Sequence, residues 1–522
     1  MLEVYYSFVL GNEFHVVLSP EQQKGFADAL LSDAECADNL LARIDVGKAI
    51  AWTEEDAEML KGWIQKGRPE FNLPGVQMNE INKDVTEAMR RWIAGAAKSE
   101  LNHRGEGEAT LRLMVLHAKL LAASSQFSEA LSALQQALTV SMNVYGEMHE
   151  ISADILTSTA NVHVEMSDLK AARKKYLRAL EIRQQVLGAD HPSIATSLLN
   201  IAELWQREDR LDAARKLYED ALVIRKNHLG ADDPDLVGIL VKLASVLHQQ
   251  SDFKGALREY QDALTITKRA RGPKHPETAD ILNSMGKTMD ELGLYDQALG
   301  IYQEALEIYQ VVRGKSSLDS AFVIENKAHV IDSQASQMDD DTETEESEAA
   351  RKKYTEAESL YRQVLEIKIA NLDTNHIEIA ITKSNLASNL ASQHRYTEAY
   401  ELYQQALDVN CKIFGEMHSN VAKIYDNMGQ VLDAQDNLQR ALEFYQLALD
   451  IKLSVPKGEL QTTTGITLFN CGQVKEGLGD FGDALAMYRR AFKIFETALG
   501  PDHPSTVQVS EAITDLENEV SE

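Results

Sequence analysis

Cysteine, proline and long apolar runs are all scarce in this sequence. Its 522 residues include three cysteines, Cys36, Cys411 and Cys471, which lie far apart and form no CxxC motif. This spacing excludes a disulfide framework and a cysteine metal knuckle, so we expect reduced thiols and a cytoplasmic protein. No run approaches the roughly 18 apolar residues of a membrane span, and the first residues lack the basic region of a secretion signal.

Positive charge is also in short supply. Lysine and arginine number 52 against 81 aspartates and glutamates, which gives a net charge of −29. A nucleic-acid binder needs cations to displace counterions from phosphates, and an anionic membrane attracts basic segments. We therefore expect neither a nucleic-acid partner nor a membrane partner. Acidic residues on exposed helix faces would keep a large protein in solution.

Constellations of catalytic or metal-binding residues are missing as well. No Ser/His/Asp or Cys/His set has the spacing of a nucleophilic site, and Gly47-Lys48 lacks the glycine loop of a phosphate cradle. His191 and His275 stand before prolines in separate loops, as does His503, and we expect them to have structural roles. The sequence therefore predicts no enzyme activity, no cofactor and no metal site.

A repeated unit dominates what is present. In residues 211–234, Ala214, Tyr218 and Ala221 fall on one helical face, and the helix pattern ends at Leu229-Gly230. The same pattern returns 42 residues on either side, as Ala172 with Tyr176 and as Ala256 with Tyr260. A fixed period of this length predicts a stack of identical helix pairs, each contacting only its neighbours.

Each predicted pair consists of a helix A followed by a helix B. We expect an all-α solenoid of about nine pairs over residues 109–499, with a capping helix in residues 500–522. In the sixth pair, the spacing between the small residues Ala328 and Ala357 is 17 residues longer than the equivalent spacing in the other pairs. We expect these extra residues to form an acidic surface loop near 337–350. Such a loop adds little closure entropy, so the array should continue beyond it.

The small and aromatic residues of the repeat resemble the tetratricopeptide repeat (TPR) signature, carried in the third pair by Ala202, Ala214, Tyr218 and Ala221. The 42-residue period and the loop at 187–196 (LGADHPSIAT) are similar to the kinesin light chain subfamily. This resemblance implies a superhelical array that binds protein or peptide segments in a concave groove, as a scaffold or adaptor. Residues 1–105 show no heptad coiled coil, which is a departure from true kinesin light chains.

The first 105 residues do not share the repeat. Their alternation of short strand and helix patterns indicates a small α/β segment. The stretches 14–20, 34–41 and 46–50 faintly resemble part of a Toll/interleukin receptor (TIR) domain, which implies a signalling protein as the alternative function. The resemblance places the NAD-cleaving glutamate three residues after Cys36, where this chain has Asn39, so we expect the TIR-like segment to be degenerate.

Two sets of residues are candidates for sites. Asparagines recur two positions before the small residue of helix A, and the TPR resemblance implies that they bind a peptide backbone: Asn200, Asn326, Asn385, Asn427 and Asn470. The alternative is that they bridge neighbouring repeats. In the acidic insertion, Ser336 and Thr342 each precede an acidic residue by three positions, so they are candidate phosphorylation sites. The insertion could equally be a solvated loop, or fold back on the groove; the partner and the oligomeric state stay open.

Overall fold

The computed structural model describes residues 107–338, 345–455, 458 and 461–521, and some residues between 87 and 101. The chain divides into two compact units, Met1–Asp252 and Phe253–Glu522. The predicted α/β segment and its TIR-like stretches lie outside the described residues, apart from the residues described between 87 and 101, which are helical.

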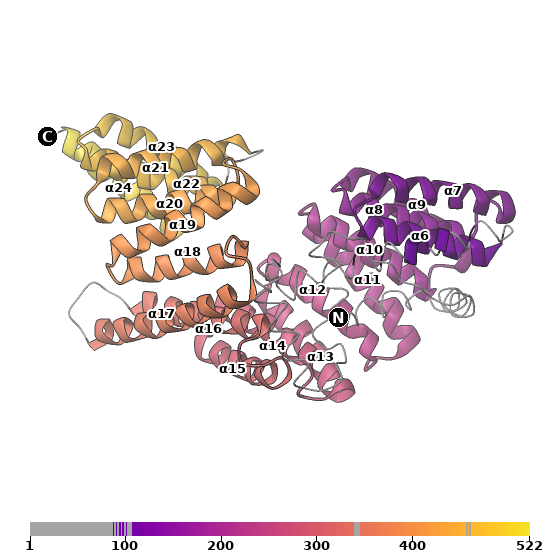
Figure 1. Ribbon diagram of the computed structural model, residues 1–522. Coiled ribbons are helices and arrows are strands. Elements are labelled where there is room, and N and C mark those ends of the chain that lie inside the picture. The colour runs from indigo at the N-terminus through magenta and orange to yellow at the C-terminus, as the bar shows by residue number, and fades with distance from the viewer. Residues whose placement is uncertain are drawn as a thin grey trace, which may run out of the picture. The chain divides into compact units, whose positions relative to one another are not determined.

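The first unit contains helices alternating between A and B positions (Figure 1). They are α6 (Glu108–Ala123), α7 (Phe127–Tyr145), α8 (Glu150–Glu165), α9 (Leu169–Leu187), α10 (Pro192–Arg207), α11 (Leu211–Leu229), the short 3₁₀ helix η3 (Pro234–Leu236) and α12 (Val237–Gln249).

The second unit continues the alternation from a B helix (Figure 1). It contains α13 (Phe253–Arg271), α14 (Pro276–Glu291), α15 (Tyr295–Val312), α16 (Leu318–Met338), α17 (Glu345–Asn371), α18 (Ile377–Ser392), α19 (Tyr396–Phe414), α20 (Ser419–Ala434), α21 (Leu438–Ser454), α22 (Thr462–Gly477), α23 (Phe481–Leu499) and α24 (Pro504–Ser521). In chain order these are nine A/B pairs and a last helix, and the described residues contain no strand, so the predicted all-α solenoid is confirmed.

Small residues and tyrosines hold the two helices of a pair together. Tyr218, Tyr302 and Tyr445 are almost completely buried, as are the alanines of the same repeats. Where helix A carries glycine, the ring lies against its backbone: a Cβ at Gly429 would stand 2.7 Å from Tyr445 Cε1. The recurring pattern therefore marks packing positions, as interiors filled to high density require.

Glycine ends most of the B helices, as the sequence predicts. Gly188, for example, follows α9 with φ = 85°, a left-handed conformation that other residues adopt only with strain. The next helix A begins four residues later, at Pro192. The loop between α9 and α10 is therefore short and fixed at both ends.

The described ends of the sixth-pair insertion are helical, whereas residues 339–344 of the expected loop lie outside the described residues. The segment expected as a loop contributes its first residues to the end of α16 and its last residues to the start of α17. Ala335 of α16 and Ala350 and Tyr354 of α17 are buried in a small cluster that joins the two extended ends. This apolar contact explains why the chain stays helical there, and Figure 1 shows α16 and α17 side by side.

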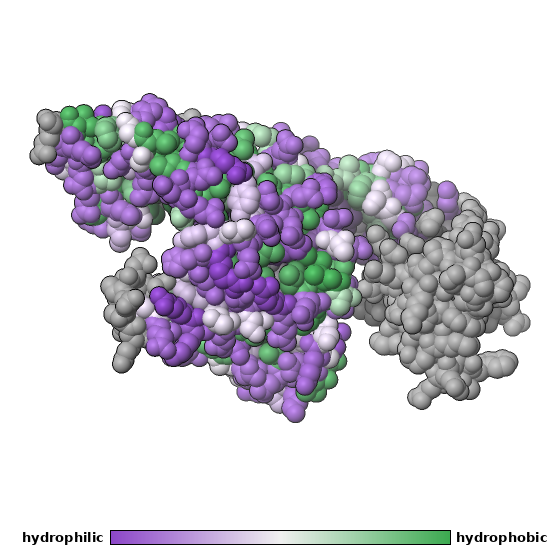
Figure 2. Space-filling view, turned by 60° about the vertical axis from the view of Figure 1, so that its left-hand side comes forward, coloured by the Kyte–Doolittle hydropathy of each residue, from purple (hydrophilic) through white to green (hydrophobic). Residues whose placement is uncertain are grey.

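The last helix closes the array with one apolar face. Val509 and Leu516 of α24 are buried against α23, in a cluster that includes Phe495. The acidic residues Glu511, Asp515, Glu517 and Glu519 of α24 are exposed. More generally, hydrophilic residues predominate on the described surface in Figure 2, with hydrophobic ones interspersed.

Candidate functional site

The A helices form the inner row of each unit. Successive A helices contact each other: α6 with α8 in the first unit, and α14, α16, α18, α20 and α22 in turn in the second. Among the described residues, successive B helices approach each other less closely. Within each unit, the A-helix face is therefore the inner side, as expected for a helical solenoid.

A cleft of about 520 Å³ lies on this face between α6 and α8. Its apolar lining includes Val115 of α6 and Ile151 of α8, both half-buried. Lys119 of α6 is exposed at the same cleft, and Asn161 of α8 lines the opposite side. The Asn161 Oδ1 accepts a hydrogen bond from the Tyr176 hydroxyl of α9, which leaves the amide group free to donate.

Arg183 of α9 forms the back of this cleft. Its side chain is only 6% exposed, and its guanidinium donates to Asp154 Oδ1 at 2.6 Å and to the Ser197 hydroxyl of α10. The Nε atom of Arg183 is buried and has no hydrogen-bond partner. One arginine thus connects a helix B with its own helix A and with the next.

Arg183 occupies a position that recurs in every helix B, eleven residues after the first small residue. Its residues are Ser141, Arg183, Arg225, Thr267, Tyr309, Lys368, Asn410, Lys452 and Phe495. Because the residue type at this position changes from repeat to repeat, the sequence alone does not reveal that the position recurs. At six of these positions, from Ser141 to Lys452, the side chain nevertheless makes a polar contact with a helix A.

Lys368 of α17 is the most deeply buried of these cations, with no exposed side-chain area. Its ammonium group donates to Glu325 of α16 at 2.6 Å and to Glu378 of α18 at 3.0 Å. Glu325 also accepts from the Thr382 hydroxyl at 2.7 Å and from the Asn385 amide at 3.3 Å. A buried charge needs such partners, because desolvation of an unpaired ion is costly.

Lys452 of α21 repeats this arrangement two pairs later. It donates to Asp426 of α20, to the Thr467 hydroxyl of α22 and to the Thr463 carbonyl oxygen. Burial raises the pKa of Asp426, and the adjacent ammonium group opposes that effect. In the intervening pair the position holds Asn410, whose one donated hydrogen bond among the described residues goes to the Ala406 carbonyl oxygen of its own helix.

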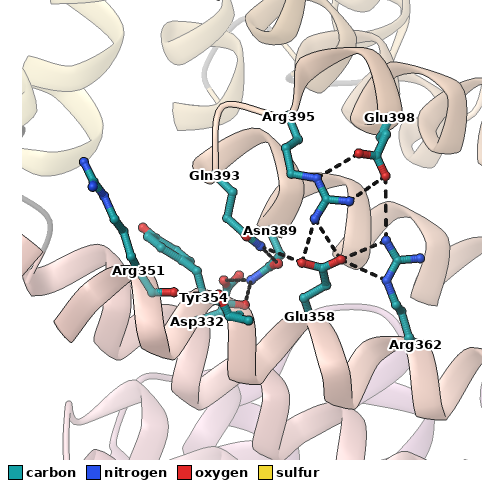
Figure 3. A network of polar contacts seen from close by, with 10 residues as sticks. Asp332, Arg351, Tyr354, Glu358, Arg362, Asn389, Gln393, Arg395 and Glu398 are labelled. Atoms are coloured by element: carbon teal, nitrogen blue, oxygen red, sulfur yellow. Dashed lines mark hydrogen bonds and ion pairs between the residues drawn. The ribbon is translucent and has the colours of Figure 1, made fainter. Parts of the chain in front are cut away.

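Figure 3 shows a further polar network, around Glu358 of α17. Arg395 donates to both carboxylate oxygens of Glu358 at 2.9 and 2.8 Å and, through other nitrogens, to Glu398 of α19. Burial raises the pKa of Glu358, but hydrogen bonds from Arg362, Arg395 and Gln393 outweigh it and hold that pKa below its usual value. The network joins α17 to the turn between α18 and α19, at the opposite end of α18 from Lys368.

Asp332 of α16 lies beside this network (Figure 3). Burial raises its pKa, and its Oδ1 accepts a hydrogen bond of 2.6 Å from the Asn389 amide of α18. Asn389 also donates to the Tyr354 carbonyl oxygen. The amide therefore joins three successive helices.

The five predicted asparagines all lie on A helices and are half-buried. The Asn326 amide donates to Asn283 of α14 at 2.8 Å, and the Asn385 amide donates to Glu325 of α16. No hydrogen bond links two of the five within the described residues. The two bonds run to the preceding repeat, which is the geometry of the bridging alternative, and each uses only one donor of its amide.

Asn427 and Asn470 lie beside the tyrosines of the preceding helix B. Burial raises the pKa of Tyr403 to about 12, and hydrogen bonds with Ser388 and Asn427 oppose this rise. Asn470 has the same relation to Tyr445, whose pKa burial also raises. Asn200 of α10 has no corresponding contact in the described part of the chain.

The histidines of the inter-repeat loops cap helices. In each case Nδ1 accepts a hydrogen bond from the backbone N–H two residues later, at 3.1 to 3.3 Å. They are His149, His191, His275, His376, His418 and His503. This confirms a structural role for the three histidines singled out by the sequence, since a side-chain acceptor at this position satisfies an otherwise unpaired N–H.

The other candidate residues are placed as follows. Ser336 is exposed near the end of α16, whereas Thr342, Cys36 and Asn39 lie outside the described residues. Cys411 and Cys471 are free thiols, and burial raises the pKa of Cys471 to about 12. The described residues include no group of three side chains able to hold a metal ion. Nor does any helix described here have the length and apolar character to span a membrane.

Comparison with known families agrees with the repeat architecture. Five stretches match a family model described as tetratricopeptide repeat: residues 108–185, 151–227, 235–310, 346–409 and 378–454. A second model of the same description matches residues 467–505, and together the matches cover more than half of the chain. The chain belongs to the tetratricopeptide repeat family. Among proteins with curated functions, none matches this chain.

Several solved structures are similar to this TPR chain. Kinesin light chain TPR-like repeats from Podosopora anserina share 17% identity, with 39% of this chain and 96% of that one covered and a TM-score of 0.36. The apo quorum sensor NprR of B. thuringiensis shares 15%, covering 76% and 99%, with a TM-score of 0.47. The human IFIT1 dimer with PPP-AAAA also shares 15%, covering 88% and 95%, with a TM-score of 0.43.

Two features of the TPR array escaped the sequence prediction. The polar position under the A helices has no constant residue type, so only the structure brings Lys368 and Lys452 into correspondence. The histidine caps did carry a sequence signal. Histidine recurs before five A helices and before the last helix, but the group that it contacts is a backbone N–H, which a pattern of side chains does not reveal.

Proposed function

We propose that this TPR protein is a non-enzymatic scaffold or adaptor that binds a peptide or protein segment along its A-helix face. The TPR fold itself is an interaction scaffold, and the finer assignment rests on the cleft between α6 and α8. That cleft combines half-buried apolar side chains with donors that have no partner in the described residues, Lys119 Nζ and the Asn161 amide. A bound segment would place an apolar side chain on Val115 and a backbone or side-chain oxygen near these donors.

The five predicted asparagines extend the proposed surface along the array. Where Asn326 and Asn385 donate one hydrogen bond to a neighbour, the second amide hydrogen and the carbonyl oxygen remain available. A backbone peptide group requires one donor and one acceptor, which such an amide can supply. The proposal therefore assigns the asparagines both a bridging and a peptide-binding role.

The test compares partners captured in cells by proximity crosslinking with three forms of the full chain. One variant alters the cleft (Val115→Asp with Lys119→Glu), and a second alters the asparagines (Asn385→Ala with Asn427→Ala). The control alters Leu447, which is 45% exposed in a second hollow of about 570 Å³ between the B helices α21 and α23 (Leu447→Asp). We expect the A-face variants to lose a common set of partners that the control retains. Equal recovery by all forms, with unchanged circular dichroism, would contradict binding on the A-helix face.

Regulation by phosphorylation forms part of the proposal. Ser336 is exposed on the last turns of α16, where a phosphate would meet the negative end of the helix dipole. We expect phosphorylation there to loosen the end of α16, and Ser336→Ala to abolish the modification on that residue. Thr342 stays a second candidate in the same segment; mass spectrometry of protein purified from cells distinguishes the two sites.

The proposal places the protein in the cytoplasm, without a cofactor and without a nucleic-acid partner. The free thiols of Cys411 and Cys471 and the net charge of −29 support these assignments. Turnover of NAD by the full-length protein would contradict the non-enzymatic assignment and favour the TIR-like alternative.

A further inference from the structure

The same chemical device begins six helices of this array. Each of α8, α10, α14, α18, α20 and α24 has a histidine whose Nδ1 accepts a backbone N–H of the first turn. A backbone N–H can only donate, so Nδ1 must carry a lone pair and the imidazole must be neutral. Protonation converts Nδ1 into a donor and removes the cap.

Protonation would also oppose the helix dipole. The first turn of a helix carries partial positive charge, which an imidazolium ion repels. Free histidine has a pKa of about 6.5, so its charge changes within the mildly acidic range. Both effects act in the same direction at all six helices.

We propose that the histidine caps make the array acid-sensitive, so that mild acidification loosens these six helix starts together. The direction follows from the hydrogen bond itself, because an imidazole that is protonated on both nitrogens cannot accept the backbone N–H. This inference goes beyond the proposed scaffold function and does not depend on it.

The chain contains its own controls. The start of η3 before α12 is capped by the Asp233 carboxylate, which accepts from the Asp235 N–H at 2.9 Å. The Ser317 hydroxyl accepts from the Ser320 N–H at the start of α16, and Gln461 before α22 provides no side-chain cap. None of these three starts depends on an imidazole.

Aromatic stacking divides the six caps into two groups. His149 stacks on Tyr145 with ring centroids 4.5 Å apart, and His418 stacks on Phe414 at 4.4 Å. A protonated imidazole on an aromatic face gains a cation–π attraction that offsets part of the lost cap. We therefore expect α10, α14, α18 and α24 to respond more strongly than α8 and α20.

Other charged groups border these caps. Near His149 they are Glu108 and Arg112 of α6, which line the same cleft, and the pair of Arg178 from α9 with Glu147. His191 follows Asp190, whose carbonyl oxygen is bonded to His228 of α11, and His275 lies between Arg271 and Glu277. His376 lies beside Glu378, which pairs with Lys368 of α17. Glu416 borders His418, and Asp502 borders His503. Apart from His228, these are carboxylates and cations whose ordinary pKa values lie outside the range from pH 5.5 to 7.4.

The test is hydrogen exchange of the full-length protein at pH 7.4 and 5.5, corrected for intrinsic rates. We expect the first turns of α10, α14, α18 and α24 to lose protection about five- to tenfold at pH 5.5, as loss of a helix cap implies. Protection at the starts of α12, α16 and α22 should change less than twofold. A uniform change across all the A helices would overturn the proposal.

A substitution separates the caps from other titrating groups. Asparagine also caps helices but does not titrate, so His191→Asn should remove the pH response of α10 and leave α14 responsive. A variant with all six histidines replaced should show a smaller fall in melting temperature between pH 7.4 and 5.5 than the wild type. Retention of the α10 response in His191→Asn would overturn the proposal. The response would then come from one of the histidines that remain in that variant, such as His163 or His228.

Discussion

Replacement of Lys368 by methionine removes the charge that neutralises Glu325 and Glu378 at the junction of α16, α17 and α18. Methionine fills a similar volume but donates no hydrogen bond. Glu325, whose side chain is 10% exposed, would keep only the Thr382 hydroxyl and the Asn385 amide as donors. Removal of one partner from a buried ion pair costs about 3–5 kcal/mol, and the two remaining donors favour the lower end. We expect Lys368→Met to destabilise this junction by about 3 kcal/mol, or roughly a hundredfold in the local opening equilibrium.

The assay must report on the second unit. All four tryptophans, Trp52, Trp63, Trp92 and Trp205, precede Phe253, so tryptophan fluorescence would not report on it. Hydrogen exchange of peptides from α17 and α18 measures the opening of the junction directly.

A matched control separates buried from exposed charge. Lys412 pairs with Asp408 one turn away at 2.6 Å, but its side chain is 58% exposed, so Lys412→Met should cost no more than about 0.5 kcal/mol. Combining Lys368→Met with Glu325→Met should recover much of the lost protection, since a buried apolar pair needs no neutralisation. If Lys368→Met and Lys412→Met affected exchange equally, the buried cluster would not be what stabilises the junction.

Two further predictions concern the packing positions and the thiols. Gly429→Ala should destabilise the eighth pair by about 1–3 kcal/mol, because the added methyl group meets the Tyr445 ring, whereas Gly482→Ala has open space and should be neutral or slightly stabilising; urea unfolding compares them. Cys471 should react with a thiol reagent at pH 8 far more slowly than Cys411, because burial raises the pKa of Cys471 to about 12 and blocks access; rapid labelling of Cys471 in the folded protein would contradict its burial.

The sequence predicted the helix pairs because each pair uses the same residue types for the same contact. Ala214 and Tyr218 recur since close helix packing admits few alternatives, and glycine recurs after helix B because the left-handed turn favours it. The acidic insertion was only partly predictable. Its charge and length suggested a loop, whereas burial of Ala335, Ala350 and Tyr354 lengthens both helices.

The candidate site was less accessible to sequence reasoning. The asparagines were identified by their position in the repeat. Their hydrogen-bond partners lie on other helices and differ in residue type: Asn385 donates to Glu325, and Asn326 donates to Asn283. The cleft between α6 and α8 depends on the spacing of two helices, which a repeat pattern does not specify. Polar contacts that differ from repeat to repeat can thus be identified only once the positions of the helices in space are known.

The polar outer face of α24 has a consequence for assembly. In a stack of identical units, any uncapped end presents the surface onto which another unit could add, so an open array would be able to grow from chain to chain. Here Val509 and Leu516 cover that surface, and the exposed Glu511, Asp515, Glu517 and Glu519 present repelling charge to an approaching copy. The helix α24 therefore covers the apolar end of α23 and presents a charged face in its place.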